Sequence, residues 1–293
     1  MSKTDATRSF ETTIELTGGP EAVWEALTSP TELARWFPLG ARVEPHKGGA
    51  LQLSWGDAFT GNCRIQEWDP PRHLRTGWME QPAADAPPPA EQTDGGSAAL
   101  IRADREAAAQ VAVDYFIAGD KGRTVLRLVH SGFSNKPSWD AEYDGVSRGW
   151  TYELRSLRHY LAHHRGTPRR VAWSRRQIDC EAGEGWSRLI GPHGIAREGA
   201  LDNPAEGDRY AIVTAGGDRF AGRVQVYRDG TDFAATVEGM NNALFRLGIE
   251  SCFGPTEAQL WMSTWGVPEA EVRELKGLFD RLLEGLFPAG RSV

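Results

Sequence analysis

Three histidines near the middle of the chain have spacings that occur in metal sites. His159 and His163 are one helical turn apart, and His164 adjoins them. Imidazole nitrogens on one helix face can bind a transition metal, but such a site needs further ligands, and no motif of the His-Glu-x-x-His type supplies them. We therefore predict no metal ion and interpret these rings as a polar helix end that interacts favourably with the helix dipole.

Two single side chains are candidates for ligand contact or catalysis. His130 alternates with Leu126 and Leu128 as on a strand, so we expect it to face the interior and to hydrogen-bond either a ligand or a neighbouring polar group. Cys63 shares the parity of Ile65 and is expected to point inward, without the nearby base that a nucleophile requires. Neither common phosphate-binding glycine motif occurs. We predict no catalytic residue and no cofactor, and lean against an enzyme.

Aromatic side chains give the most informative pattern. The chain contains 11 tryptophans, and bulky groups this frequent must line cores, cavities or interfaces. We expect six ligand-binding residues to line one interior space: Trp36, Trp55, Tyr115, His130, Trp150 and Leu157. Trp36 is expected at the mouth of this space. Large aromatics can also fill such a space, so both an open cavity and a solid core fit the pattern.

These residues lie on a series of strands followed by a long helix. Apolar residues recur at spacings of three and four from Asp140 to His163, which predicts an amphipathic helix. One face of an antiparallel sheet must be covered, so we predict an α+β fold in which this helix packs across the sheet. Strands are expected at 10–16, 41–44, 50–55, 60–68, 73–78, 111–117 and 126–130, with short helices at 20–28 and 31–37.

The second half of the chain repeats this plan. GDAFTG at 56–61 matches GDRFAG at 217–222, an offset of 161, and a second long helix is expected from about Pro268. We predict two domains, residues 1–166 and 167–293. The stretch 81–108 is rich in Pro, Ala, Asp and Gly without a period, and we expect it to be a mobile insertion.

Charge and hydropathy exclude some classes of partner. The net charge of −7 works against general nucleic-acid binding, and we interpret the one basic cluster, around Trp173, as a connector between domains. No apolar run approaches the roughly 18 residues of a membrane span, and no signal peptide is evident, so we expect a cytoplasmic protein. The basic cluster around Trp173 consists of Arg165, Arg169, Arg170, Arg175 and Arg176.

Four stretches of the first half resemble a known family. PEAVWEALTSPTELARWF at 20–37, EWDPPRHL at 67–74, GRTVLRLVHSGF at 122–133 and GWTYELRSLRHYL at 149–161 are similar to the SRPBCC superfamily, in the branch named for the activator of heat-shock protein 90 ATPase. The resemblance implies a helix-grip (START-like) fold: a curved antiparallel sheet around a long C-terminal helix, often with an apolar cavity between them. The second half resembles a divergent copy, so tandem helix-grip domains are expected.

Three functions of different classes are compatible with this resemblance. We favour a non-catalytic protein that binds a small hydrophobic or amphipathic molecule in the first domain. The second function is binding of a protein partner, as in the heat-shock protein 90 activator. The third is an enzyme like the cyclases and aromatases of this fold, which polarise a carbonyl with cavity side chains. Fold alone does not choose among them, and the sequence does not indicate an oligomeric state.

Overall fold

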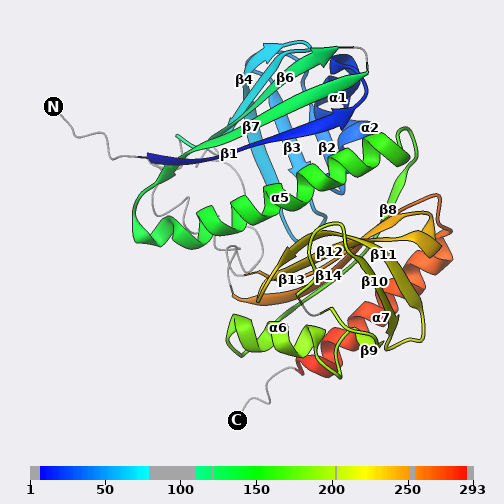
Figure 1. The fold of residues 1–293 in the computed structure, drawn as a ribbon. Coiled ribbons are helices and arrows are strands. Elements are labelled where there is room, and N and C mark those ends of the chain that lie inside the picture. The colour runs from blue at the N-terminus through cyan, green and yellow to red at the C-terminus, as the bar shows by residue number, and fades with distance from the viewer. Residues whose placement is uncertain (1–6, 79–109, 121, 202, 251–254, 289–293) are drawn as a thin grey trace. The chain divides into compact units, whose positions relative to one another are not determined.

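The chain forms two compact units, which divide between Gly166 and Thr167 (Figure 1). The computed structural model describes residues 7–78, 110–120, 122–201, 203–250 and 255–288. The insertion expected at 81–108 lies outside the described residues. Within the described ranges, no helix is both long and apolar enough to cross a membrane.

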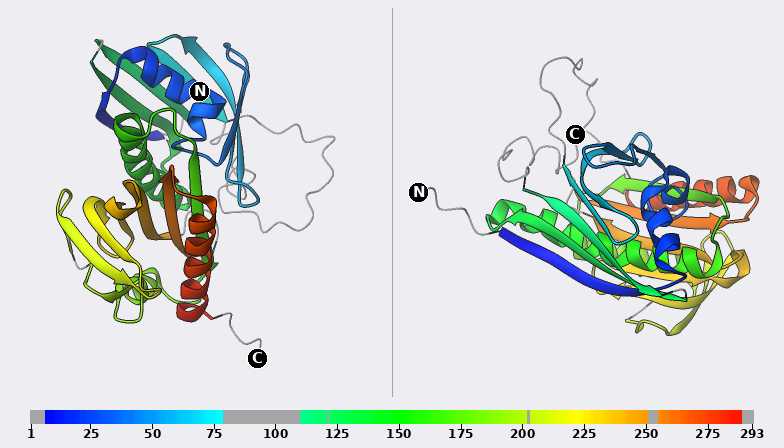
Figure 2. Two further views of the ribbon diagram at one scale, coloured as in Figure 1. Left: turned by 90° about the vertical axis from the view of Figure 1, so that its right-hand side faces the viewer. Right: turned by 90° about the horizontal axis from the view of Figure 1, so that it is seen from above.

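The first unit is a curved antiparallel sheet with a long helix across one face (Figures 1 and 2). Its seven strands have the order β1-β7-β6-β5-β4-β3-β2. The strands are β1 (Thr7–Thr17), β2 (Gly40–Val43), β3 (Ala50–Ser54), β4 (Thr60–Asp69), β5 (His73–Trp78), β6 (Ala112–Asp120) and β7 (Arg123–Ser134), and the helices are α1 (Pro20–Thr28), α2 (Pro30–Leu33), η1 (Pro137–Trp139) and α5 (Asp140–His163). Helix α5 has the bounds expected from its apolar spacing.

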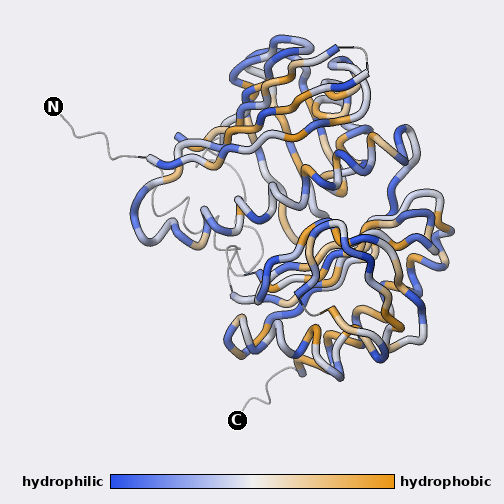
Figure 3. Tube along the Cα trace, viewed as in Figure 1, coloured by the Kyte–Doolittle hydropathy of each residue, from blue (hydrophilic) through white to orange (hydrophobic). Residues whose placement is uncertain are grey.

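Burial of apolar side chains holds α5 on the sheet. Trp150, Leu154, Leu157 and Leu161 are all buried. Full burial of each large apolar side chain contributes roughly 1.5–3 kcal/mol. Along the strands, orange and blue-white segments alternate because successive side chains face the core and the solvent (Figure 3).

Helix α2 is shorter than the sequence pattern predicts. It ends at Leu33, and the backbone N–H groups of Trp36 and Phe37 donate to the carbonyl of Leu33 in a tightening turn. Pro38 restricts the backbone of Phe37, the residue before it, so it closes this turn rather than ending the helix at Leu33. As a result, Trp36 and Phe37 lie on irregular backbone beside α5.

A buried polar network fixes α2 to α5. The Tyr160 hydroxyl donates to Glu32 Oε2 at 2.5 Å and accepts from the Gly166 backbone N–H at 2.9 Å. Arg35 forms an ion pair with the same Glu32 carboxylate. One turn away, Ser156 Oγ donates to the Trp36 carbonyl at 2.8 Å. These bonds set the position of the turn that carries Trp36 and of the last residue of the first unit.

The second unit has the same topology in its own residues. Its seven strands have the order β8-β14-β13-β12-β11-β10-β9, so each strand has a counterpart in the first unit. The predicted α+β class and tandem helix-grip architecture are confirmed. The strands are β8 (Arg169–Gln177), β9 (Ala196–Glu198), β10 (Arg209–Thr214), β11 (Arg219–Arg228), β12 (Asp232–Val237), β13 (Ala243–Glu250) and β14 (Glu257–Trp265), with helices α6 (Ala182–Ile190), η2 (Glu238–Met240) and α7 (Glu269–Leu286).

Strand irregularities give the residue correspondence between the units. The β4–β5 pairing shifts after Ile65 and the β11–β12 pairing shifts after Val224, an offset of 224 − 65 = 159. At the preceding positions, the Arg64 and Arg223 guanidinium groups donate to a glycine carbonyl at 2.7 and 2.9 Å. The hexapeptide match at offset 161 therefore marks corresponding turns but is two residues out of structural register.

Phenylalanine rings fill the interior of the second unit. The side chains of Phe220, Phe233, Phe245 and Phe279 are fully buried. The Phe245 ring contacts the other three. Its centroid lies 5.4 Å from that of Phe220, 6.3 Å from that of Phe233 and 6.0 Å from that of Phe279. Packed aromatic rings therefore occupy the interior of this unit.

The polar network predicts a stability difference between two tyrosines. Tyr160→Phe removes a buried hydroxyl that makes two hydrogen bonds, so we expect the free energy of unfolding to fall by about 1–3 kcal/mol in urea denaturation. In the control Tyr143→Phe, the lost hydroxyl donates to the Ser9 carbonyl at an exposed position, and the change should stay within about 0.5 kcal/mol. Equal effects of the two changes would contradict a structural role for the network.

Candidate functional site

Trp150 is the centre of an aromatic group inside the first unit. Helix α5 presents the indole to the sheet, where its ring centroid lies 5.9 Å from that of Tyr115 on β6 and 6.2 Å from that of His130 on β7. Phe37, from the turn after α2, lies 5.4 Å away. Three different parts of the fold therefore meet at one indole.

His130 has its protonation state set by its surroundings. Its Nδ1 accepts a hydrogen bond of 2.9 Å from Trp150 Nε1, and an indole N–H can only donate. The proton of the neutral imidazole is therefore on Nε2. This Nε2 atom is buried and has no hydrogen-bond partner within the described part of the chain, and the residue is 8% exposed. Burial lowers the pKa of His130 from 6.5 to about 3, so the ring is neutral near pH 7.

Two further polar groups on this face of the sheet are also uncharged. Burial raises the pKa of the Cys63 thiol from 9.0 to about 11 and raises the pKa of Tyr115 well above its usual value, with a smaller effect of Cys63 on Tyr115. A thiol with this pKa is a poor nucleophile at neutral pH. The inner polar groups can therefore form hydrogen bonds but are not poised to exchange protons.

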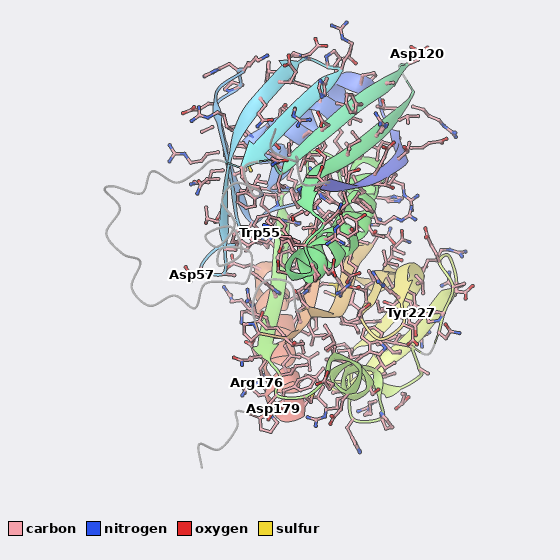
Figure 4. The ribbon with its side chains drawn as sticks, turned by 90° about the vertical axis from the view of Figure 1, so that its left-hand side faces the viewer. Trp55, Asp57, Asp120, Arg176, Asp179 and Tyr227 are labelled. Atoms are coloured by element: carbon pink, nitrogen blue, oxygen red, sulfur yellow. The ribbon has the colours of Figure 1, made fainter. Side chains whose placement is uncertain are left out.

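Four half-buried aromatic rings continue outward from Trp150, and we name them the aromatic edge: Phe37, Trp55, Phe59 and Trp78. Their ring centroids are 5.3 Å apart between Phe37 and Trp55, 5.8 Å between Trp55 and Phe59, and 6.3 Å between Phe59 and Trp78. Trp55 lies at the same end of the sheet as Asp57, opposite to Asp120 (Figure 4). A continuous aromatic surface thus links a partly exposed end of the sheet to His130.

A glycine lies beneath two of these rings. Gly61 pairs with Leu53 in the β3–β4 ladder. A Cβ at this position would lie 3.3 Å from Phe59 Cε1 and 3.6 Å from Trp78 Cη2. In the second unit, the register offset of 159 places Phe220 at this position, where its buried ring contributes to the phenylalanine core.

The second unit also lacks the polar groups of the first. In the first unit, cross-strand pairing runs from Ile65 through Thr76 and Val113 to His130. The same path from Val224 runs through Ala235 and Phe245 to Met262, so methionine takes the place of His130. Two residues beyond Phe245, Leu247 takes the place of Tyr115, and both replacements are fully buried in the apolar core.

The family of the first unit follows from a comparison with known proteins. Residues 19–162 match the family described as Activator of Hsp90 ATPase homolog 1-like protein, AHSA1. This segment belongs to the AHSA1 family. The resemblance found in the sequence is confirmed, and we refer to the first unit as the AHSA1 unit. None of the curated proteins compared with the chain matches it.

Three solved structures are among those similar to the chain. A protein of Mesorhizobium loti is 21% identical with a TM-score of 0.39, covering 53% of this chain and 97% of its own. The Aha1 dimer of Colwellia psychrerythraea is 14% identical with a TM-score of 0.41, covering 54% and 99%. The di-domain ARO/CYC BexL from the BE-7585A biosynthetic pathway is 14% identical with a TM-score of 0.40, covering 95% and 97%.

The AHSA1 unit brings together four of the six residues singled out in the sequence. Tyr115 and His130 each contact Trp150, and Trp55 reaches Trp150 through Phe37. The other two lie in packed surroundings. Trp36 is 1% exposed and its Nε1 donates to the Ala26 carbonyl at 2.9 Å, while Leu157, on α5, is fully buried.

Three residues of the aromatic edge were missed in the sequence. Trp78 shares strand parity with Leu74 and Thr76, so alternation alone was enough to find it. Phe37 and Phe59 lie in turns, where no period predicts the direction of a side chain. The position expected of Trp36, at the exposed end of the interior, is taken by its neighbour Phe37.

The three clustered histidines do not form a metal site in the described residues. The ring centroids of His159, His163 and His164 are 4.8–6.1 Å apart. No group of three potential ligands within the described ranges has a geometry that holds a metal ion.

The basic cluster is not a free connector. Residues 169–177 form strand β8, where Arg175 pairs with Glu257 at 2.6 Å and Arg170 donates to the Val267 carbonyl at 3.2 Å. The expectation of a solvated linker here was wrong, because Arg169, Arg170, Arg175 and Arg176 belong to this edge strand of the sheet. Arginines with intramolecular partners are less available to phosphates.

The buried histidine predicts a specific loss of stability in acid. The pKa of His130 is about 3 in the folded state, against 6.5 for a histidine in water, so between these values the unfolded chain binds a proton that the folded chain does not. Stability is therefore complete above pH 6.5 and falls as the pH drops. We compare the protein with His130→Gln by urea denaturation, and expect the protein to lose about 2 kcal/mol more than the variant between pH 7 and pH 5. Parallel pH profiles would show that His130 titrates normally.

Proposed function

We propose that the AHSA1 unit binds a small hydrophobic or amphipathic molecule in the interior between its sheet and α5, and that residues 167–293 form a second domain without this site. The observation that carries the proposal is the aromatic path from the half-buried edge to His130, whose Nε2–H has no partner within the described residues. Pockets for small molecules are typically apolar with a few placed polar groups, and this interior has that composition.

The internal copy supports the proposal. Both units have one topology, yet the second fills its interior with Phe220, Phe245 and other apolar groups. A buried polar group without a partner is unfavourable by about 1–3 kcal/mol. A fold that needed only a core would do better with the methionine of the second unit than with His130, so the retained polar group favours a binding role.

The protonation states favour binding over catalysis. A general acid or base works best with a pKa near the working pH. The inner groups lie far from this range, with a pKa of about 3 for His130 and about 11 for Cys63. A cyclase-like reaction would need another proton donor, so we propose a non-catalytic role.

Binding of a protein partner is the alternative that the family description raises, since it names an activator of an ATPase. In that case an exposed surface would do the work and the aromatic interior would be structural. The two functions differ in one measurable property, namely whether a small apolar molecule enters the AHSA1 unit.

Fluorescence of N-phenyl-1-naphthylamine, an uncharged aromatic probe, tests the proposal. We expect one probe to bind per chain with a Kd on the order of 1–10 μM, and Trp55→Ala to weaken binding by at least about fivefold because it removes part of the aromatic edge. Native mass spectrometry gives the stoichiometry and identifies any small molecule that co-purifies.

A matched control exists in the second unit. Tyr227 on β11 is also a half-buried aromatic residue (Figure 4), and Tyr227→Ala should leave the Kd within about twofold. If the protein binds neither this probe nor a panel of lipids and aromatic compounds, and shows no shift in Tm with them, the proposal is wrong and the partner-binding role is favoured.

A further inference from the structure

We infer that the ligand of the AHSA1 unit is an uncharged, flat aromatic compound with a hydrogen-bond-accepting oxygen, and that the Nε2–H of His130 binds this oxygen. This inference rests on the proposed function and narrows it to a class of ligand. It is carried by the geometry around His130, by the uncharged inward positions of the central strands and by the orientation of the surrounding rings.

The donor is fixed by the hydrogen bond from Trp150. Because indole Nε1–H occupies Nδ1 of His130 as an acceptor, Nε2 can only donate. Nε2 is closed to solvent and unpaired within the described residues, and the Phe133 ring centroid lies 4.6 Å from that of His130. An acceptor must therefore arrive with a ligand that displaces apolar neighbours. A donor that is unsatisfied without ligand favours ligands that supply an acceptor over those that do not.

Among the described residues, the inward positions of the central strands β4 to β7 offer no countercharge to an ionised ligand. The inward positions of the central strands, which pair across the sheet with Cys63, Tyr115 and His130, carry apolar side chains or threonine: Ile65, Leu74, Thr76, Val113, Ile117, Leu126 and Leu128. His130 itself stays neutral, because its pKa is about 3. A carboxylate buried here would lose its hydration without gaining an ion pair at His130. Fatty-acid anions are therefore poor candidates.

The rings favour a flat ligand. Phe37 is tilted by 36° on Trp150, and Trp55 meets Phe37 edge to face at 84°. Tyr115 meets Trp150 edge to face at 78°. Such arrangements present ring faces and edges to one another at favourable centroid separations, and an inserted aromatic ring can replace one of them with little loss of contact.

Matched ketones and hydrocarbons test the role of the donor. We would measure Kd values by tryptophan fluorescence quenching for 9-fluorenone against fluorene and for 1-indanone against indane, since each pair differs chiefly in a carbonyl oxygen. With the unmodified protein we expect the ketones to bind about tenfold more tightly, which is the effect of roughly one neutral hydrogen bond.

Two variants at the same site locate the donor. His130→Phe should abolish the ketone preference and leave hydrocarbon affinity within about threefold, whereas Tyr115→Phe should retain the preference. His130→Gln keeps an acceptor for Trp150 and an amide donor, so it should restore part of the preference and remains informative if His130→Phe does not fold. Loss of the preference in Tyr115→Phe, with retention in His130→Phe, would overturn the inference.

The outcomes separate this inference from the proposed function. Equal binding of ketone and hydrocarbon overturns the inference while leaving the AHSA1 unit as a binder of apolar molecules. Absence of binding by all four compounds, together with failure of the naphthylamine probe, overturns both. An independent readout is ¹⁵N NMR of the histidine side chains without ligand: a proton on Nε2 of His130 supports the inference, and a proton on Nδ1 contradicts it.

Discussion

Each sheet in this protein has one face that a single long helix must shield from water, and the rest of the structure follows from how that shielding is completed. In the AHSA1 unit, α5 buries the indole of Trp150 against the sheet, where His130 accepts a hydrogen bond from the indole N–H. The hydrogen bond removes the energetic penalty of burying the indole N–H, but it leaves the His130 Nε2–H as a donor without a partner in the described part of the chain. In the second unit the same kind of helix closes over phenylalanine rings and no such donor arises at the corresponding methionine, Met262.

Elements with a clear period were predictable from the sequence, and elements in turns were not. The bounds of α5 follow from its apolar spacing, and strand parity placed Tyr115 and His130 on one face. Strand parity does not apply to the turn after α2, so the sequence did not distinguish Trp36, which is buried in the core, from Phe37, which is half-buried. That difference depends on the turn after α2 and on the hydrogen bonds from Ser156 and Tyr160 of α5 that hold it.

The internal repeat shows a related limit of sequence comparison. The most similar hexapeptides of the two halves lie in corresponding turns but out of structural register, whereas the weaker similarity at Arg64 and Arg223 marks true correspondence. The arginines are equivalent because each fixes a glycine carbonyl at the same bulge, a geometric role that few other side chains perform. The two arginines, which have the same hydrogen-bonding role, therefore identify the structural register of the two units, whereas the similar hexapeptides do not.

The glycine at position 61 affects how the neighbouring aromatic rings are held. Where the second unit anchors a phenylalanine in its strand, the AHSA1 unit has no side chain, and rings from the β3–β4 turn and from the end of β5 lie over the gap. A ring rooted in a strand is held by the ladder on both sides, whereas a ring leaning in from a turn is held mainly by its neighbours. The two copies of one topology therefore differ in a way that suits the proposed binding role: one has an aromatic ring anchored in its strand, and the other has a glycine at the same position.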